Sequence, residues 1–158
     1  MDDRPILTAA EVRTLLREFM PDRQGIDVAE VTPDGVLFTA DAESLSVRPG
    51  GTVSGPAIFA FADVSAYLTV SAYLGRTPSA VLSSSSISFL EAVEPGPLRA
   101  RIEPVRIGRR TGVFTAWVED ERACRVAMAT LHFSFPGRRG RSGTVGAVDA
   151  VGAVGAVG

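Results

Sequence analysis

One carboxylate stands alone in the most apolar part of this chain. Between Arg48 and Arg76 the only Asp, Glu, Lys or Arg is Asp63. If this stretch is helical, the side chains three and four positions away are uncharged, namely Phe59, Ala60, Ala66 and Tyr67. An unpaired carboxylate in apolar surroundings is costly unless it is hydrogen-bonded or faces a solvated pocket. In an apolar cleft such a group can act as a general base or a nucleophile, so Asp63 is the first candidate for a catalytic residue.

Two points about Asp63 stay open at this level. It can instead cap a neighbouring element or pair with an Arg from a strand, because structural ion pairs also isolate carboxylates. Burial would raise the pKa of Asp63 and the helix N-terminus would lower it, so the direction of the shift does not follow from the sequence.

The residues just before this apolar stretch, Ser54, Gly55 and Pro56, form a helix entry. Free backbone N–H groups point outward at a helix N-terminus, where the helix dipole is positive. Such an entry can hold a developing oxyanion. It can equally be a plain cap, because Ser and Gly before a Pro in the first turn are common at the start of any helix.

The apolar stretch itself predicts a long buried helix. From Pro56 to Leu74 it is rich in Ala and apolar at nearly every position, and it ends at Gly75. A helix that is apolar on all sides is a buried helix. An earlier amphipathic helix is predicted from the capping box that begins at Thr8 until Pro21 ends it.

Alternating apolar and polar residues predict strands around the buried helix. A turn signal, Thr32-Pro-Asp-Gly35, separates the first two strands, which form a hairpin whose second strand runs on toward Val47. The six predicted strands are Ile26–Val31, Val36–Ala40, Ala80–Leu90, Leu98–Ile107, Gly112–Glu119 and Ala123–Phe135. Hairpin-length connections make the last four antiparallel. The predicted fold class is α+β, with long antiparallel strands wrapped around one central helix.

Composition argues against several classes of function. The formal net charge of −2 gives no basic surface of the kind that a phosphate backbone needs, so we expect no nucleic-acid partner. A single Cys124 and a single His132 exclude an intrachain disulfide and leave too few ligands for a zinc-type metal site. The acidic N-terminus does not have the pattern of a signal peptide, and no uninterrupted apolar run suggests a membrane span. We expect a cytoplasmic protein with no membrane partner.

The chain divides into three parts. Residues 1–23 carry the N-terminal helix, residues 24–137 form the main domain, and residues 138–158 are a tail rich in Gly, Ala and Val. Such a tail cannot repay the entropy of ordering, so we predict that it is disordered and assign no function to it.

Residues 44–135 resemble the hotdog-fold acyl-CoA thioesterases of the PaaI-like, phenylacetate-pathway type. The resemblance is carried by three motifs, which are Gly55 with Ile58-Phe-Ala-Phe-Ala-Asp63, Ile87-Ser-Phe-Leu90 leading to Pro95-Gly96, and Gly108-Arg109-Arg110. It implies an antiparallel sheet wrapped around the helix and a homodimer that pairs two sheets edge to edge, often doubled into a homotetramer. It also implies active sites at the dimer interface.

The resemblance further implies roles for individual residues. Asp63 matches the family's catalytic carboxylate, which activates water or attacks the thioester carbonyl directly. Gly55 matches the glycine whose backbone N–H polarises that carbonyl. Arg109 and Arg110 fall where relatives contact the phosphates of coenzyme A, although a solvated hairpin turn is an equal alternative. Coenzyme A is then part of the substrate, and no separate cofactor is expected.

Three more positions are candidates for substrate binding. Ser54 stands where the family usually has a His before two Gly residues, and Arg48 stands where relatives often carry a polar side chain. Ser84 belongs to a run of four Ser, at the place where relatives put a polar residue near the thioester of the partner's site. Strand alternation puts Ser84 and Ser86 on one face of the strand.

The leading hypothesis is hydrolysis of an acyl-CoA thioester to the free acid and coenzyme A. One alternative is a non-catalytic acyl-CoA binding module that has kept the pocket and lost the chemistry. Another is a hotdog dehydratase or hydratase. Those enzymes usually place a catalytic His near the helix, whereas His132 lies in the last strand and is expected to be structural.

Overall fold

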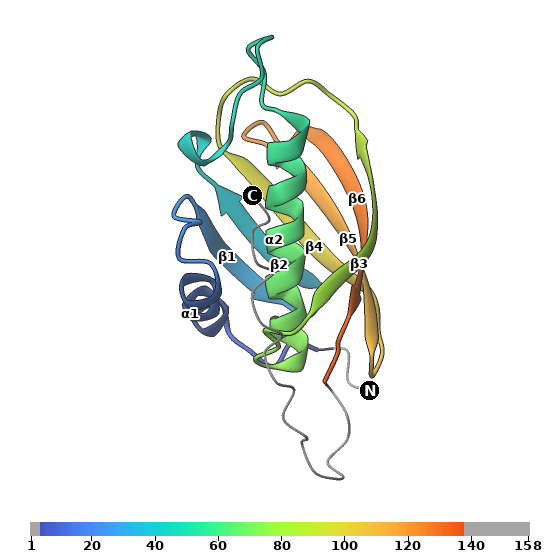
Figure 1. The fold of residues 1–158 in the computed structure, drawn as a ribbon. Helices are drawn as coiled ribbons and strands as arrows, with labels where there is room; N and C mark the ends of the chain where they lie inside the picture. Colours follow the sequence, from blue (N-terminus) through green and yellow to red (C-terminus); the bar gives the residue numbers. More distant parts are fainter. Residues whose placement is uncertain (1–3, 138–158) are drawn as a thin grey trace, which may run out of the picture.

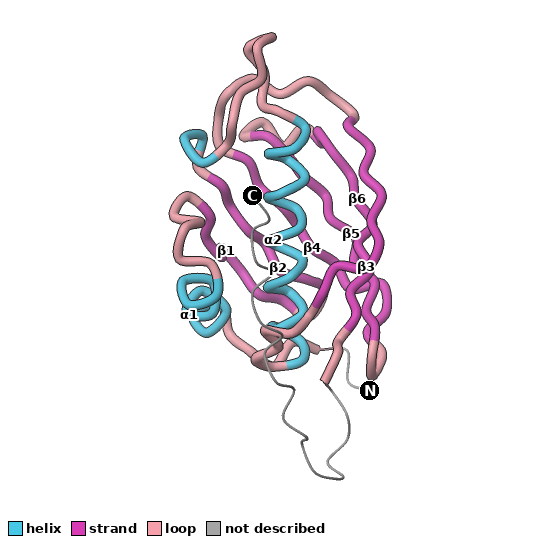
Figure 2. The backbone as a smooth tube through the Cα atoms, in the orientation of Figure 1, coloured by secondary structure: helices cyan, strands magenta, loops and turns pink. Residues whose placement is uncertain are grey.

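A long helix packs across one face of a single curved antiparallel sheet (Figure 1). The computed structural model describes residues 4–137, so the predicted disordered tail lies outside the described residues. The elements are α1 (Ala9–Phe19), β1 (Ile26–Thr32), β2 (Gly35–Ala40), a 3-10 helix (Ala42–Ser44), α2 (Gly55–Leu74), β3 (Val81–Phe89), β4 (Leu98–Ile107), β5 (Thr111–Asp120) and β6 (Arg125–Ser134). The six strands lie in the order β1-β2-β4-β5-β6-β3 (Figure 2). The predicted α+β class, with the sheet around one central helix, is confirmed.

Local signals fix both ends of α2. The Ser54 side chain caps the first turn by accepting a hydrogen bond from the Ala57 N–H at 3.2 Å. At the other end Gly75 takes a φ of 77°, and its N–H donates to the Ser71 carbonyl. Glycine adopts this positive φ readily because it has no Cβ.

Burial of α2 supplies much of the core. By length and composition α2 is apolar enough to cross a membrane, yet 67% of its most apolar window is buried inside the protein. The sheet covers it with large side chains such as Phe38, Phe114 and Phe133, each at most 1% exposed. A helix that is apolar on nearly every side is typical of this central position in a core.

Strand β5 shows how the sheet divides into an inner and an outer face. Its even-numbered residues from Gly112 to Val118 are buried toward α2, and its odd-numbered residues from Val113 to Glu119 are partly exposed. A period of two is expected of a strand with one buried face. The same alternation assigns a face to residues of the neighbouring strands that pair with β5.

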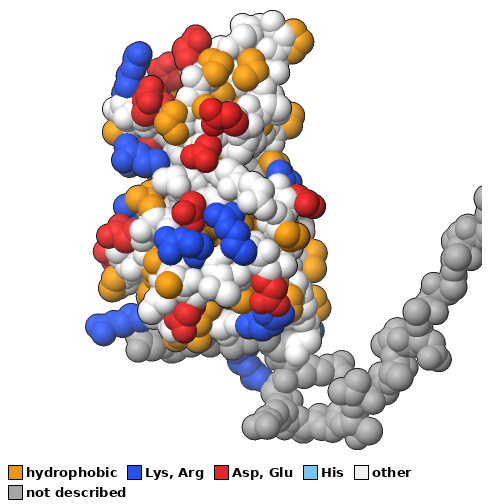
Figure 3. All heavy atoms as spheres, turned by 90° about the vertical axis from the view of Figure 1, so that its left-hand side faces the viewer, with side chains coloured by type: hydrophobic (Ala, Val, Ile, Leu, Met, Phe, Trp, Pro, Cys, Tyr) orange, Lys and Arg blue, Asp and Glu red, His pale blue; other side chains and the backbone are white. Residues whose placement is uncertain are grey.

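Helix α1 belongs to the same core as the sheet. The predicted capping box is confirmed, because the Glu11 carboxylate accepts a hydrogen bond from the Thr8 N–H at 2.8 Å and the Glu11 N–H donates to the Thr8 hydroxyl. Leu16 is fully buried in the shared core cluster. Arg13 ties the helix to β1 through an ion pair with Asp27 at 2.8 Å. On the face that carries α1 and β1, basic and acidic side chains are interspersed (Figure 3).

One predicted strand is too long. The second strand of the first hairpin ends at Ala40 and does not run on toward Val47. The chain leaves the sheet there because it turns into the 3-10 helix Ala42–Ser44. Val47 keeps only an isolated bridge to Val53.

The start of β6 and the connection between β3 and β4 also differ from prediction. Strand β6 begins at Arg125 instead of Ala123, because Ala123 takes a φ of 62° in the tight turn that follows β5. The segment between β3 and β4 is not a hairpin, since β3 pairs with β6 while β4 lies between β2 and β5. The predicted antiparallel pairing itself is confirmed.

Strand β3 forms one edge of the sheet. It pairs with β6 on one side, and within residues 4–137 no strand pairs with its other side. Most of its residues are exposed, including Val81 at 54% and Phe89 at 52%. An exposed edge strand presents unpaired N–H and C=O groups and is a natural place for another chain to add.

One buried hydroxyl in α2 yields a stability prediction. Ser65 is fully buried, and its Oγ has no hydrogen-bond partner among the described residues. Ser65→Ala removes this unsatisfied group and improves helix propensity, so we expect stabilisation by about 1 kcal/mol. A thermal melt measures the change.

Thr69 provides the matched control, because its buried hydroxyl donates to the Ser65 carbonyl at 2.8 Å. Thr69→Val should give no gain in melting temperature. A loss of stability in Ser65→Ala would show that the Ser65 hydroxyl makes a bond after all.

Candidate active site

The entry of α2 offers one backbone donor to a ligand. The N–H groups of Ala57 and Ile58 donate back to Ser54, and Pro56 has no N–H. Within the described part of the chain nothing accepts a hydrogen bond from the Gly55 N–H. Because this donor lies at the positive end of the helix dipole, it suits an oxyanion.

The aromatic ring of Phe89 lies against this donor. A Cβ placed on Gly55 would come within 3.1 Å of the Phe89 ring. The end of edge strand β3 therefore packs directly on the helix entry, and a side chain at position 55 would require the ring to shift slightly. Ser54, the cap, is also tied to the preceding loop by a hydroxyl–hydroxyl contact of 3.1 Å with Ser46.

Asp63 lies on the side of α2 that the sheet leaves partly uncovered. Phe59 and Tyr67, one turn to either side, are also partly exposed, while the flanking Ala62 and Val64 are buried. No described residue makes a hydrogen bond or an ion pair with Asp63, so the alternative role as a cap or ion-pair partner has no support in residues 4–137. Burial raises the pKa of the Asp63 carboxyl, and the charge of Arg23 only partly offsets this.

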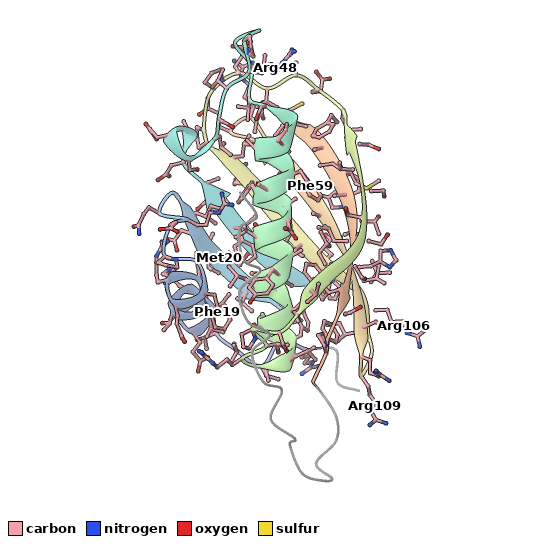
Figure 4. All side chains as sticks on the ribbon, viewed as in Figure 1. Phe19, Met20, Arg48, Phe59, Arg106 and Arg109 are labelled. Carbon is pink, nitrogen blue, oxygen red and sulfur yellow. The ribbon has the colours of Figure 1, made fainter. Side chains whose placement is uncertain are left out.

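Aromatic residues mark the two flanks of this side of α2. Figure 4 shows Phe19 and Met20, at the end of α1, on one flank, and Phe59 on the flank toward β3. Phe19 packs edge-on against Tyr67, with ring centroids 6.1 Å apart. Asp63 therefore lies on an apolar strip with α1 on one side and β3 on the other.

A pocket of about 230 Å³ opens beside the first two turns of α2. Its wall on the helix side consists of Pro56, Ala57, Ala60 and Phe61. Arg23, from the loop between α1 and β1, also lines it. Asp63 does not line the pocket itself, but it follows the lining residue Ala60 by one helical turn.

Gly55 and Asp63 lie too far apart for one chain to combine them directly. They are eight positions apart in α2, which is about 12 Å along the axis of an α-helix. An oxyanion donor and an attacking group each need to lie about 3 Å from the reacting group. A carbonyl held by the Gly55 N–H is therefore beyond the direct reach of the Asp63 carboxylate of the same chain.

Arg48 occupies an exposed turn next to the helix entry. Its Nε donates to the Thr52 hydroxyl at 2.6 Å, and the turn closes with a backbone bond from Gly51 to Arg48. Figure 4 shows Arg48 at the same end of the molecule as the start of α2. Its guanidinium retains further donors for a ligand at this end.

The register of β3 places Ser84 on the outer face of the sheet. Ser84 pairs with His132, which is exposed, whereas Ser85 pairs with Leu131, which is fully buried toward α2. The bulge between Leu82 and Ser84 inserts an extra residue and so reverses the faces that follow. The strand therefore offers Ser85 to the helix side, and Ser84 points away from the Asp63 of its own chain.

Arg109 and Arg110 lie in the turn between β4 and β5, at the opposite end of the molecule from Arg48 (Figure 4). The Arg110 carbonyl accepts a hydrogen bond from the Phe135 N–H at 2.8 Å, and both Arg residues are exposed. Within one chain these two residues therefore lie apart from Arg48 and the start of α2.

The structure adds three residues that the sequence interpretation missed. Arg23 reaches the pocket from the loop after α1, and no sequence signal connected it with α2. Phe89 belongs to one of the matched motifs, which predict no role for it, and the register of β3 puts Ser85, instead of the predicted Ser84, on the helix side. Among residues 4–137 no group of three or more His, Cys, Asp or Glu side chains could hold a metal ion.

The chain is similar to a known protein family and to a curated esterase. The family model described as the thioesterase superfamily matches residues 50–127, a range that contains Gly55 and Asp63. The curated "Putative esterase ComA2" of Bacillus subtilis (strain 168) is 28% identical over 99 residues, which cover 62% of this chain and 79% of that protein.

Solved structures agree with this match. The structure of a "putative thioesterase" from Silicibacter sp. TM1040 has a TM-score of 0.77 and 29% identity, and the similarity covers 86% of this chain and 96% of that one. The E. coli PaaI protein from the phenylacetic acid degradation operon has a TM-score of 0.68 and 18% identity, covering 82% and 96% of the two chains. At that identity the second likeness shows the fold alone.

The raised pKa of Asp63 gives a prediction for stability. Because the folded-state pKa lies above the unfolded value, the ionised carboxylate destabilises the fold, and the wild type loses stability as pH rises through the folded-state pKa. Asp63→Asn should therefore raise the free energy of unfolding at neutral pH, and with it the melting temperature. The gain should be less than about 1 kcal/mol because the group is partly solvated.

The difference between Asp63→Asn and wild type should disappear at acid pH, below the unfolded pKa, where both side chains are neutral. Melting curves recorded from acid to neutral pH test this. A destabilised variant at neutral pH would show that the carboxylate has a structural partner.

Proposed function

Because the chain is a hotdog-fold protein of the thioesterase superfamily, we propose that it hydrolyses an acyl-CoA thioester to the free acid and coenzyme A, with Asp63 as the reactive carboxylate. The observation that carries the proposal is the position of Asp63. It lies without a hydrogen-bond or ion-pair partner among the described residues, on the uncovered side of a core helix and beside a pocket. Its raised pKa is typical of a functional carboxylate.

Two routes of hydrolysis use the same groups. As a general base, Asp63 accepts a proton from water while the water oxygen bonds to the thioester carbon, and the Gly55 N–H stabilises the oxyanion. The carbonyl then re-forms and the C–S bond breaks. The thiolate of coenzyme A leaves and takes up the proton that Asp63 had accepted. As a nucleophile, Asp63 bonds to the carbon itself and expels the thiolate, and water then hydrolyses the resulting anhydride.

We assign the two groups of one site to two copies of the chain. The distance of about 12 Å along the helix separates Gly55 from Asp63 within one copy, and edge strand β3 is free to pair with its counterpart. A homodimer formed at β3 would place Ser85 and Phe89 at the boundary. It also offers the substrate the phosphate-binding candidates Arg109 and Arg110 of a second chain.

The other expectations stand as parts of the proposal. The protein works in the cytoplasm as a dimer or tetramer, without a separate cofactor and without nucleic-acid or membrane partners. A non-catalytic acyl-CoA binding module is the second candidate, and Pro56 favours it, because the helix entry then has fewer donors. A dehydratase has less support, because His132 is exposed on the outer face of the sheet.

Thiol release from a panel of short, long and aromatic acyl-CoA esters tests the proposal. Wild type should turn over at least one ester, and Asp63→Asn should lose activity by roughly 10²- to 10⁴-fold. Circular dichroism checks that the variant is folded. Tight binding without turnover, unaffected by Asp63→Asn, would establish the binding-module alternative.

The pH profile of kcat/KM supplies a second test. Since the pKa of Asp63 is raised, the acid limb should have its midpoint above the ordinary range of an Asp carboxyl. Activity should fall as pH drops through this midpoint, because the protonated carboxyl can neither accept a proton nor attack. A flat profile down to pH values where free Asp is half protonated would contradict the role of Asp63.

Mixed dimers test the two-chain site. Gly55→Pro removes the backbone donor, and the position before it is already extended as proline requires, with Ser54 at φ −71° and ψ 144°. Because the proline ring would press on Phe89, all chains carry Phe89→Ala, and the chain with this change alone serves as the wild-type reference. A dimer of one Gly55→Pro chain and one Asp63→Asn chain, isolated with two affinity tags, has one complete site and should show about half of the reference activity.

The crossed control distinguishes the two arrangements. A dimer of one reference chain and one chain that carries both changes has no complete site if the site spans two chains. If each chain worked alone, this dimer would keep half of the activity and the first dimer would have none.

A further inference from the structure

The geometry points to a specificity pocket for the acyl group, in which Arg23 recognises an uncharged oxygen at the end of a short acyl chain. This inference rests on the proposed function and deepens it, because it names the class of substrate. The pocket of about 230 Å³ beside α2 is the site, and a hydroxyl or carbonyl oxygen is the group recognised.

The position of the pocket fits an acyl group whose carbonyl is at Asp63. Ala60 lines the pocket one helical turn before Asp63, so an acyl chain running toward the helix N-terminus reaches it after one turn. The small side chains of Ala57 and Ala60 leave the space open, and Phe61 and Ile26 make its walls apolar. A volume of this size takes a short chain, since drug-sized ligands occupy about 300–1,000 Å³.

Arg23 supplies the donor in this apolar pocket. Its side chain is exposed, and among residues 4–137 its guanidinium makes no hydrogen bond or ion pair. The other polar side chains of the pocket are already engaged, because Ser44 donates to the Asp41 carbonyl at 2.7 Å and Ser46 contacts Ser54. An oxygen acceptor on the substrate therefore meets Arg23 as the available partner.

The charges around Arg23 favour an uncharged oxygen over a carboxylate. Arg23 and Ser44 also line an adjoining pocket, whose other lining residues include the acidic Asp22, Asp41 and Glu43. Asp63 adds a further negative charge close enough to interact with Arg23. One guanidinium among several carboxylates attracts a dipole but does not offset the repulsion that an anionic acyl group would meet.

Three acyl-CoA esters of equal chain length test the inference, namely pentanoyl-CoA, 5-hydroxypentanoyl-CoA and glutaryl-CoA. Wild type should prefer the hydroxy ester to the other two by about tenfold in kcat/KM, as expected for a hydrogen bond to a charged donor. Arg23→Met keeps the side-chain stem and removes the donors, and it should abolish the preference for the hydroxy ester over pentanoyl-CoA. Arg122→Met, at an Arg that is also exposed, in the turn after β5, should leave all ratios unchanged.

Ala60→Leu provides a second variant, which fills the pocket. It should reduce turnover of all three five-carbon esters relative to acetyl-CoA. Equal use of the three esters by wild type, a preference for glutaryl-CoA, or ratios unchanged in Arg23→Met would each overturn the inference. None of these outcomes affects the proposed function, which fails only if no ester is hydrolysed or if turnover is indifferent to Asp63.

Discussion

The structure depends on the need to bury one helix that is apolar on almost every side. A single curved sheet covers most of α2, and α1 covers part of the remainder. The strip that stays partly open carries Phe59, Asp63 and Tyr67. A polar side chain on this strip meets both an apolar wall and water, which is the setting that the proposed reactive carboxylate needs. The same rigid core that hides the helix also holds its carboxylate in place.

Local signals explain how much of this could be predicted. The capping box at Thr8, the turn before Gly35 and the apolar run of α2 are each contained in a short stretch of sequence, and each predicted its element correctly. Asp63 was found because charge is absent for many residues around it. These features need no knowledge of which strands are neighbours.

The features that could not be predicted depend on long-range packing. The bulge after Leu82 decides which Ser faces the helix, and it becomes visible only in the register with β6. Arg23 approaches the pocket from a loop forty positions before Asp63 in the sequence. The early end of β2 follows from the 3-10 turn after Ala40, where the alternating pattern suggested that the strand continues.

The contact between Phe89 and Gly55 joins the edge of the sheet to the start of α2. A Cβ at position 55 would lie 3.1 Å from the ring at position 89, so the ring would have to shift to make room for a side chain there. The ring in turn lies on the strand that is free to meet another chain. The two positions therefore form one steric unit, so that in related sequences a larger residue at one should accompany a smaller residue at the other.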